Sequence, residues 1–222
     1  MVARSSNLLL AHGASRVTEI GRQKLEFGVH ELGLVVGTDK IDLLLYYIKL
    51  LLKWNKVYSL TAITDFEQAI TLHLLDGLTV IPHLGDARHI IDVGSGMGVP
   101  GIVIAICYPD IQVCALDSNH KKTAFLQQVA IELGLTNLQV ICCKVEEYKP
   151  KHLYDLAISR AFSSSQMFIN LTGHLLLDSG VWLLMKSKRV EAELDKISSY
   201  NYNLIPLRIP GCIDERYLLK IK

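Results

Sequence analysis

Three alternating glycines follow a short apolar run in the middle of the chain, and their spacing is the strongest chemical signal in the sequence. The run 90–93 has the length and composition of a buried strand, and Gly94, Gly96 and Gly98 follow it directly. Glycines at such a turn remove side chains where the backbone has to approach a ligand closely. Pro100 then suits the first turn of a helix, whose amide groups face the same place. The pattern predicts a nucleotide-like ligand at the carboxyl edge of a doubly wound sheet.

Two ligand classes fit this loop. Read from Asp92, the spacing Asp-x-Gly-x-Gly-x-Gly is typical of methyltransferases that use S-adenosylmethionine (AdoMet). Read from Gly96, the spacing Gly-x-Gly-x-x-Gly is the dinucleotide fingerprint, with Asp117 about 20 residues on as its ribose-binding acid. The acid at Asp92, a terminal strand hairpin and the lack of a second domain for a hydride acceptor favour AdoMet.

Polar residues at the ends of the later strands are the next candidates. Asp117 is placed to accept both ribose hydroxyls of a nucleoside, or alternatively to cap the following helix. After the third strand, the backbone of Val145 and the carboxylate of Glu146 are placed to read an adenine edge, although a solvated acidic turn fits nearly as well. Arg160 ends the fourth strand, where a guanidinium reaches the pocket and can meet a carboxylate such as the methionine end of AdoMet. A lone arginine there is otherwise usually a surface ion pair.

The elements that position these residues alternate between strand and helix from residue 88 onward. Repeated strand–helix units predict an α/β fold, a Rossmann-like AdoMet methyltransferase fold with a seven-stranded, mostly parallel sheet covered by helices on both faces. The last two strands are separated by only a short loop, so we expect an antiparallel terminal hairpin. The predicted strands are 88–93, 111–117, 138–144, 154–159, 180–186, about 203–209 and 216–221, and the predicted helices are 99–107, 119–133, 164–177 and 188–199.

Three regions are expected: a flexible N-terminus over 1–16, a helical extension over 17–86 and the methyltransferase domain over 87–222. Within the extension, Thr38 is a plausible N-cap for an amphipathic helix over 39–56, and Thr64 opens a capping box. Residues 17–36 suit a helix only loosely, because Gly21 and Gly28 weaken the pattern. Further on, His73 and Asp76 are three apart and share a helix face, which alone favours a surface hydrogen bond over a catalytic pair.

Composition bounds the class of protein. The 222 residues contain 23 basic and 22 acidic side chains, so any surface that attracts nucleic acid has to be local. No apolar run is long enough for a transmembrane helix. The five cysteines are odd in number, lie mostly in apolar runs and lack metal-ligand spacing, which predicts reduced core cysteines in a cytoplasmic protein.

Several motifs together resemble one family, the RsmG family of small-subunit rRNA guanine-N7 methyltransferases, also called glucose-inhibited division protein B. The resemblance covers residues 20–222, with departures from the usual family sequence at Ser59, Gly77 and Ser187. It implies AdoMet as cofactor, with contacts at Gly94, Val99, Val145, Glu146 and Arg160. The motifs are Trp54-Asn55-Lys56-Val57-Tyr58-Ser59-Leu60-Thr61, His73-Leu74-Leu75-Asp76, the glycine loop 92–101, Leu116-Asp117-Ser118 and Ile158-Ser159-Arg160-Ala161-Phe162.

Methylation of guanine N7 needs no general base, because that nitrogen carries an exposed lone pair, and we therefore assign no catalytic acid or base. The expected partner is 16S rRNA or a small ribosomal subunit particle, bound by a monomer. Candidate phosphate contacts are Lys186, Lys188, Arg189, Arg216, Lys220 and the lysine face of the 39–56 helix. The alternatives are a methyltransferase for another RNA or a small molecule, an NAD-linked oxidoreductase, and a non-catalytic ribosome-assembly factor.

Overall fold

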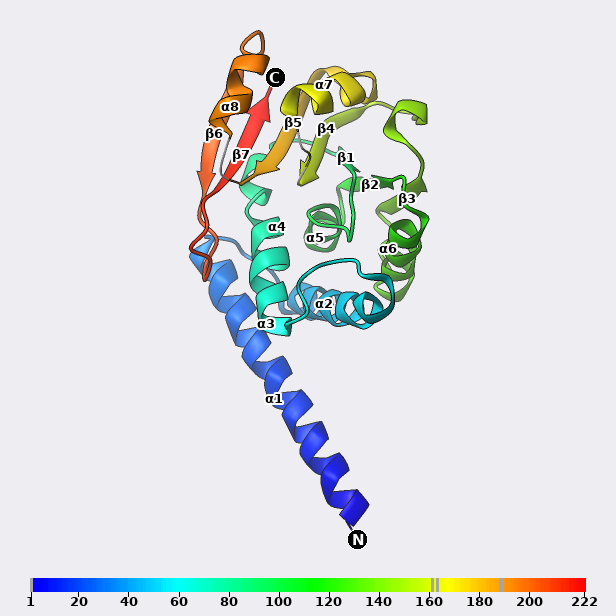
Figure 1. Cartoon of the computed structure of the whole chain (residues 1–222), viewed down its shortest axis with the longest axis vertical. Helices are drawn as coiled ribbons and strands as arrows, with labels where there is room; N and C mark the ends of the chain where they lie inside the picture. Colours follow the sequence, from blue (N-terminus) through cyan, green and yellow to red (C-terminus); the bar gives the residue numbers. More distant parts are fainter. Residues whose placement is uncertain (1, 161, 163, 188–189) are drawn as a thin grey trace.

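A seven-stranded sheet forms the centre of the computed structural model, which describes residues 2–160, 162, 164–187 and 190–222 (Figure 1). The strand order is β3-β2-β1-β4-β5-β7-β6; the first five strands are parallel, and β7 runs antiparallel to both β5 and β6. The predicted fold class and terminal hairpin are confirmed. The strands are β1 (His89–Val93), β2 (Gln112–Asp117), β3 (Leu138–Cys142), β4 (Tyr154–Arg160), β5 (Leu176–Lys186), β6 (Tyr202–Leu207) and β7 (Arg216–Ile221).

The register of the sheet brings the candidate residues to one edge. In β1, Val93 lies beside Leu116 of β2, so the glycine loop begins next to Asp117. On the other side of β1, Asp92 lies beside Ile158 of β4, which places Arg160 just beyond the end of β1. Because the chain continues from β1 to β2 on one side and only later reaches β4 on the other, the crevice between β1 and β4 is the topological switch point where such sheets bind ligands.

Helices cover both faces of the sheet, as the alternating pattern predicted. The helices α2 (Thr38–Tyr58), α5 (Gly101–Cys107) and α6 (His120–Glu132) pack on the face that carries Ile90, Val113 and Ile158. The opposite face packs against α7 (Ser165–Thr172), the 3₁₀ turns η4 (Gly173–Leu175) and η5 (Asp195–Ile197), and the short α8 (Glu191–Leu194). Between β3 and β4 only the 3₁₀ turn η3 (Val145–Glu147) is present.

The N-terminal region packs on this domain through a long helix and a broken one. The helix α1 (Val2–Glu31) extends away from the body of the molecule (Figure 1). Its glycines, predicted to weaken it, allow close packing: a Cβ on Gly21 or Gly28 lies 2.5 Å from Phe66 or Leu75, respectively. The broken helix runs from 66 to 78 and consists of α3 (Phe66–Ala69), the π-helical turn η1 (Ile70–Leu75) and α4 (Asp76–Leu78). The 3₁₀ turn η2 (Ile81–His83) follows it.

Some predicted boundaries are wrong. Gly37, not Thr38, is the N-cap of α2, and Asp65, not Thr64, caps α3 by accepting from the amide of Gln68. The strand β5 begins at Leu176, so the predicted helix over 164–177 is shorter than expected. The three-region division at 16 and 86 stays a prediction.

Candidate functional site

The glycine loop after β1 has one open side and one packed side. Gly94, Gly96 and Gly98 all have positive φ (68°, 61° and 102°), so these positions favour glycine over other residues. A Cβ on Gly94 meets no atom within 4 Å, whereas one on Gly98 lies 2.4 Å from the Ile102 side chain. The amides of Gly94 and Ser95 donate to the Leu116 carbonyl, which fixes the loop to β2. Space for a ligand therefore exists at the first glycine and not at the third.

Asp92 supports this loop from below. Its side chain is fully buried, and Oδ2 accepts from the amide of Gly101 at 2.9 Å, which holds the first residue of α5 against β1. Oδ1 is buried without a hydrogen-bond partner in the described part of the chain. Burial raises the pKa of Asp92 to about 7, although the Gly101 amide and the charge of Arg160 oppose the shift. Its side chain thus acts inside the protein rather than at the surface of the crevice.

The carboxylate of Asp117 accepts hydrogen bonds from the protein's own backbone. Oδ2 accepts from the amide of Gly96 at 2.9 Å, Oδ1 accepts from the amide of Asn119 at 2.8 Å, and Lys122 Nζ lies 3.9 Å from Oδ2. The cap of α6 is Asn119, whose side chain accepts from the first amides of the helix. Asp117 thus joins the glycine loop to the end of β2. Each of its oxygens keeps a lone pair, and ribose binding stays a prediction.

A π-helical turn provides polar groups that the sequence pattern did not predict. At the end of η1 the amide of Asp76 donates to the carbonyls of Thr71 and His73. It therefore does not donate to the Leu72 carbonyl, as it would in a regular α-helix. That carbonyl accepts from Arg160 Nη1 at 3.0 Å, and the same Nη1 lies 3.1 Å from Asp76 Oδ2. Such turns occur often at functional sites. The guanidinium at the end of β4 therefore pairs with the carboxylate of Asp76 in α4, and its contact with a cofactor carboxylate stays a prediction.

His73 joins this network to the loop after α2. Its Nδ1 lies 2.9 Å from the Leu72 carbonyl and its Nε2 lies 3.0 Å from Thr61 Oγ1. Asn55 holds that loop in place by accepting from the Thr61 amide at 2.8 Å. Burial, with a contribution from the Arg160 charge, lowers the pKa of His73 to about 4, so the imidazole is neutral at pH 7. The expected surface hydrogen bond between His73 and Asp76 is therefore wrong: both side chains are buried in the site and bond to different partners.

A cavity of about 590 Å³ lies where these elements meet. It is lined by residues of the 60–63 loop, η1 and α4, the glycine loop, the start of α6, and the ends of β4, β5, β6 and β7. Among the predicted cofactor residues, Gly94, Gly96, Val99 and Arg160 line it. Asp117, Val145 and Glu146 are not in its lining and lie at the neighbouring ends of β2 and β3.

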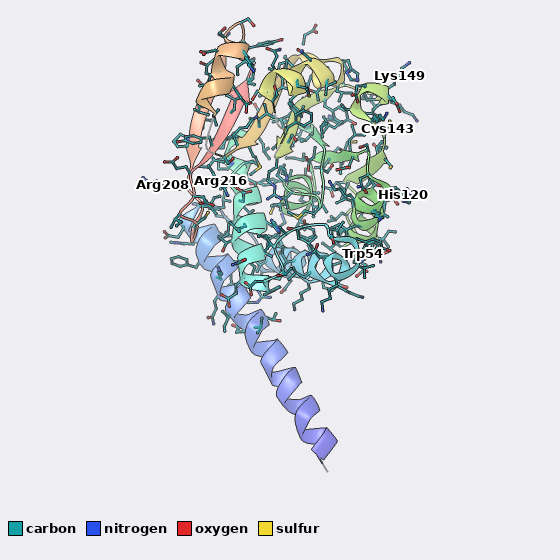
Figure 2. The ribbon with its side chains drawn as sticks, viewed as in Figure 1. Trp54, His120, Cys143, Lys149, Arg208 and Arg216 are labelled. Atoms are coloured by element: carbon teal, nitrogen blue, oxygen red, sulfur yellow. The ribbon has the colours of Figure 1, made fainter. Side chains whose placement is uncertain are left out.

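The predicted RNA-binding residues differ in their surroundings. Lys186 and Arg216 line the cavity. Lys186 is buried, with Nζ 2.8 Å from Glu193 Oε2 and 3.1 Å from the Phe162 carbonyl. Arg216 is partly exposed and contacts its own hairpin loop, and Figure 2 labels it on the terminal hairpin that also carries Arg208. Lys188 and Arg189 lie outside the described residues.

Two classes of site are not found in the part of the chain that the structure describes. No cluster of histidine, cysteine and acidic side chains there has the arrangement of a metal site. None of the described helices combines the length and the apolar character that crossing a membrane requires.

Comparison with known proteins gives consistent results. The family described as GidB, rRNA small subunit methyltransferase G, matches residues 40–218. A "Ribosomal RNA small subunit methyltransferase G" of Methylobacillus flagellatus is 44% identical over 198 residues, 89% of this chain and 96% of the relative. One of Pseudomonas aeruginosa is 41% identical over 211 residues, 94% and 98% of the two chains.

Solved structures share the fold at low identity. A "SAM dependent methyltransferase" from Aquifex aeolicus aligns with a TM-score of 0.54 at 14% identity, covering 68% of this chain and 90% of that chain. A precorrin-6y C5,15-methyltransferase from Geobacter metallireducens aligns with a TM-score of 0.52 at 14% identity, covering 75% and 92%. At these identities the likeness concerns the fold alone.

Proposed function

The chain belongs to the rRNA small subunit methyltransferase G family, and from this premise we propose that it transfers a methyl group from AdoMet to N7 of a guanine in 16S rRNA. The observation that carries the proposal is the family match over residues 40–218, which contains both the glycine loop and Arg160. The cavity between these two elements lies at the edge of the sheet where AdoMet fits.

The residues present suit the cofactor. The open space at Gly94 and Gly96 lets a ligand lie against the backbone, and Val99 contributes an apolar wall. Arg160 uses only Nη1 for Leu72 and Asp76, and its Nη2 and Nε make no hydrogen bond to any residue that the structure describes. Arg160 is therefore able to bind the methionine carboxylate and keep Asp76.

The adenosine half of the cofactor is assigned to the ends of β2 and β3. Asp117 offers carboxylate oxygens to the ribose hydroxyls. The backbone amide of Val145 offers a donor to the adenine edge, and the exposed carboxylate of Glu146 offers an acceptor for its amino group. These assignments rest on the position of the residues beside the glycine loop and on the family motifs.

The reaction needs no acid or base from the protein. When bound, AdoMet supplies an electrophilic methyl group on a sulfonium sulfur, and guanine N7 brings its own lone pair. The work of the protein is to align the two groups and to exclude water. A neutral His73 fits this role, because it holds Thr61 and the Leu72 carbonyl in place without adding a charge beside the cationic product.

Binding of RNA is assigned to local basic groups around the cavity. Lys186 and Arg216 line it, and Lys188 and Arg189 follow β5 in sequence. Because basic and acidic residues are nearly equal in number, free RNA is expected to bind weakly, which favours an assembled small-subunit particle as substrate. We further propose that the protein works as a monomer in the cytoplasm. Cysteines stay reduced in that compartment.

The test is methylation by the purified protein. Small ribosomal subunits and protein-free 16S rRNA from cells lacking the endogenous methyltransferase are incubated with labelled AdoMet, and the RNA is mapped by mass spectrometry. We expect one 7-methylguanosine, formed faster in the particle, with inhibition by S-adenosylhomocysteine. A methyl group on another atom contradicts the N7 assignment, and faster methylation of protein-free rRNA contradicts the particle as substrate.

A further inference from the structure

The cavity extends past the proposed cofactor residues on one side. From the glycine loop beyond β1 it continues across the end of β4 to the ends of β5 and β7. The adenosine residues lie on the other side of β1, toward β2 and β3. The part of the cavity near β5 and β7 therefore remains for the target base, and Ile63, Met185, Leu207 and Tyr217 give it apolar walls.

One acidic side chain lines this cavity among the residues that the structure describes, and it is Asp76. Apart from Tyr217, all other ionisable groups in the described lining are cationic or imidazole side chains: His73, Lys122, Arg160, Lys186 and Arg216. A single acid among five such groups at an RNA-binding site needs an explanation, because RNA phosphates repel it.

The bonding of Asp76 leaves acceptor capacity unused. Oδ2 pairs with Arg160, whereas Oδ1 makes no hydrogen bond to the described residues. Asp76 Oδ1 also differs from the buried Oδ1 of Asp92, because it is not sealed from the cavity. Burial raises the pKa of Asp76, and the neighbouring guanidinium groups of Arg160 and Arg216 oppose this shift by favouring the ionised carboxylate.

We propose that Asp76 recognises the Watson–Crick edge of the target guanine, with Oδ1 accepting from N1–H and the second lone pair of Oδ2 accepting from the 2-amino group. Guanine presents two adjacent donors on that edge, whereas adenine presents a donor and an acceptor, so an ionised carboxylate selects guanine. N7 lies on the opposite edge of the base and stays free for the methyl group. This inference rests on the proposed function.

The test compares guanosine with inosine, which lacks the 2-amino group, at the target position of reconstituted small-subunit particles. For the wild-type protein, we expect kcat/KM for inosine to fall roughly 10- to 100-fold below that for guanosine, the range of one hydrogen bond to a charged group. Asp76→Asn should reduce this ratio to within about twofold of the ratio for non-enzymatic methylation. The amide nitrogen at the Oδ1 position faces the N1–H donor, so the base no longer docks with its 2-amino group against the remaining oxygen. The exposed Asp178→Asn on β5 is the matched control and should keep the wild-type ratio.

Calorimetry with S-adenosylhomocysteine separates this role from cofactor binding. Asp76→Asn should bind the nucleoside within about threefold of wild type, since the amide oxygen still accepts from Arg160. An unchanged guanosine-to-inosine ratio in Asp76→Asn overturns the proposal and leaves Asp76 as a partner of Arg160 or of the cofactor's amino group. If the variant does not fold, a wild-type ratio equal to the non-enzymatic one overturns it alone. A wild-type protein that methylates neither base at N7 refutes the proposed function instead.

Discussion

The two ends of the proposed cofactor cleft are built differently. At the methionine end, between β1 and β4, the side chains of Arg160, Asp76 and His73 are largely buried and bonded to one another or to shared partners. At the adenosine end, beyond β2 and β3, Asp117 is bonded to the backbone, and Glu146 is exposed on a short 3₁₀ turn. Substitutions at the methionine end should therefore change both stability and binding, whereas substitution of the exposed Glu146 at the adenosine end should change binding alone.

Gly94→Asp should have the largest effect, because this position lies between the two ends. The open space at its Cβ means that the cost in unfolding free energy is limited to left-handed strain, about 1–2 kcal/mol. The new carboxylate occupies the ligand's place, and affinity for S-adenosylhomocysteine should fall at least about 100-fold, or roughly 3 kcal/mol. Calorimetry and urea denaturation measure the two effects.

Gly98→Ala is the matched control for Gly94→Asp. Its Cβ meets the side chains of Ile102 and Leu126 at 2.4 and 2.8 Å, so overpacking adds about 1–3 kcal/mol to the backbone strain. In Gly98→Ala the main loss should be in unfolding free energy, and the folded fraction should keep measurable affinity for S-adenosylhomocysteine. Equal loss of affinity in the two variants contradicts the division of the loop into an open and a packed side.

Arg160→Ala should weaken both properties of the methionine end. Loss of the guanidinium leaves Asp76 buried without its partner, at a cost of about 2–4 kcal/mol. The pKa of Asp76 is already raised by burial and rises further in the variant. Since the folded protein then binds a proton more tightly than the unfolded chain, the variant's stability falls as the pH rises above 3.8. Its deficit should be larger at pH 8 than at pH 5.

The same variant should bind S-adenosylhomocysteine roughly 10- to 100-fold more weakly, as expected for one lost charge-assisted hydrogen bond. Arg208→Ala is the control, because Arg208 is exposed and has no ion pair with the residues that the structure describes. It should change neither quantity. Weaker binding with full stability contradicts the buried pair, and lost stability with full affinity makes Arg160 purely structural.

His73 gives the methionine end a pH dependence of opposite sign. Its pKa is about 4 in the folded protein and 6.5 in the unfolded chain, so the unfolded chain binds more protons in this window and stability falls as the pH drops from 6.5 to 4. The shift corresponds to about 3 kcal/mol. His73→Gln should remove most of this slope, measured as the difference from wild type so that Asp92 and other groups cancel. Parallel curves for the two proteins contradict a buried neutral imidazole.

The sequence predicted the sheet well because its signals are local. Short apolar runs separated by helices, with a hairpin too short for a helix, determine the strand number and direction. Helix caps were less predictable: Thr64 and Asp65 both carry side chains that can cap a helix, and the structure uses Asp65. Gly21 and Gly28 were interpreted from propensity, whereas their close contacts depend on Phe66 and Leu75, far away in sequence.

In the site, too, the features set by one segment could be predicted and those set by distant segments could not. The glycine loop could be predicted because positive φ and close approach leave a pattern in one segment. The network of Thr61, His73 and Arg160 could not, because its members come from three segments and depend on a π-helical turn with no signature in residue spacing. The ordered motifs around Thr61 and His73 were the available signal, and they came from family resemblance.

The smallest effect is expected at the adenosine end, from Glu146→Gln. Glu146 is exposed and has no hydrogen bond or ion pair with the described residues, so the unfolding free energy should stay within about 0.5 kcal/mol of wild type. Its amide keeps one oxygen acceptor, so only the charge is lost, and affinity for S-adenosylhomocysteine should fall about three- to tenfold. Glu147→Gln, whose carboxylate lies 3.9 Å from Lys144, is the adjacent control and should leave affinity unchanged. An equal response of the two variants means that the turn contributes a diffuse negative field rather than a contact. A loss as large as that of Arg160→Ala means that the adenosine end, despite its exposure, holds the cofactor as firmly as the buried network does.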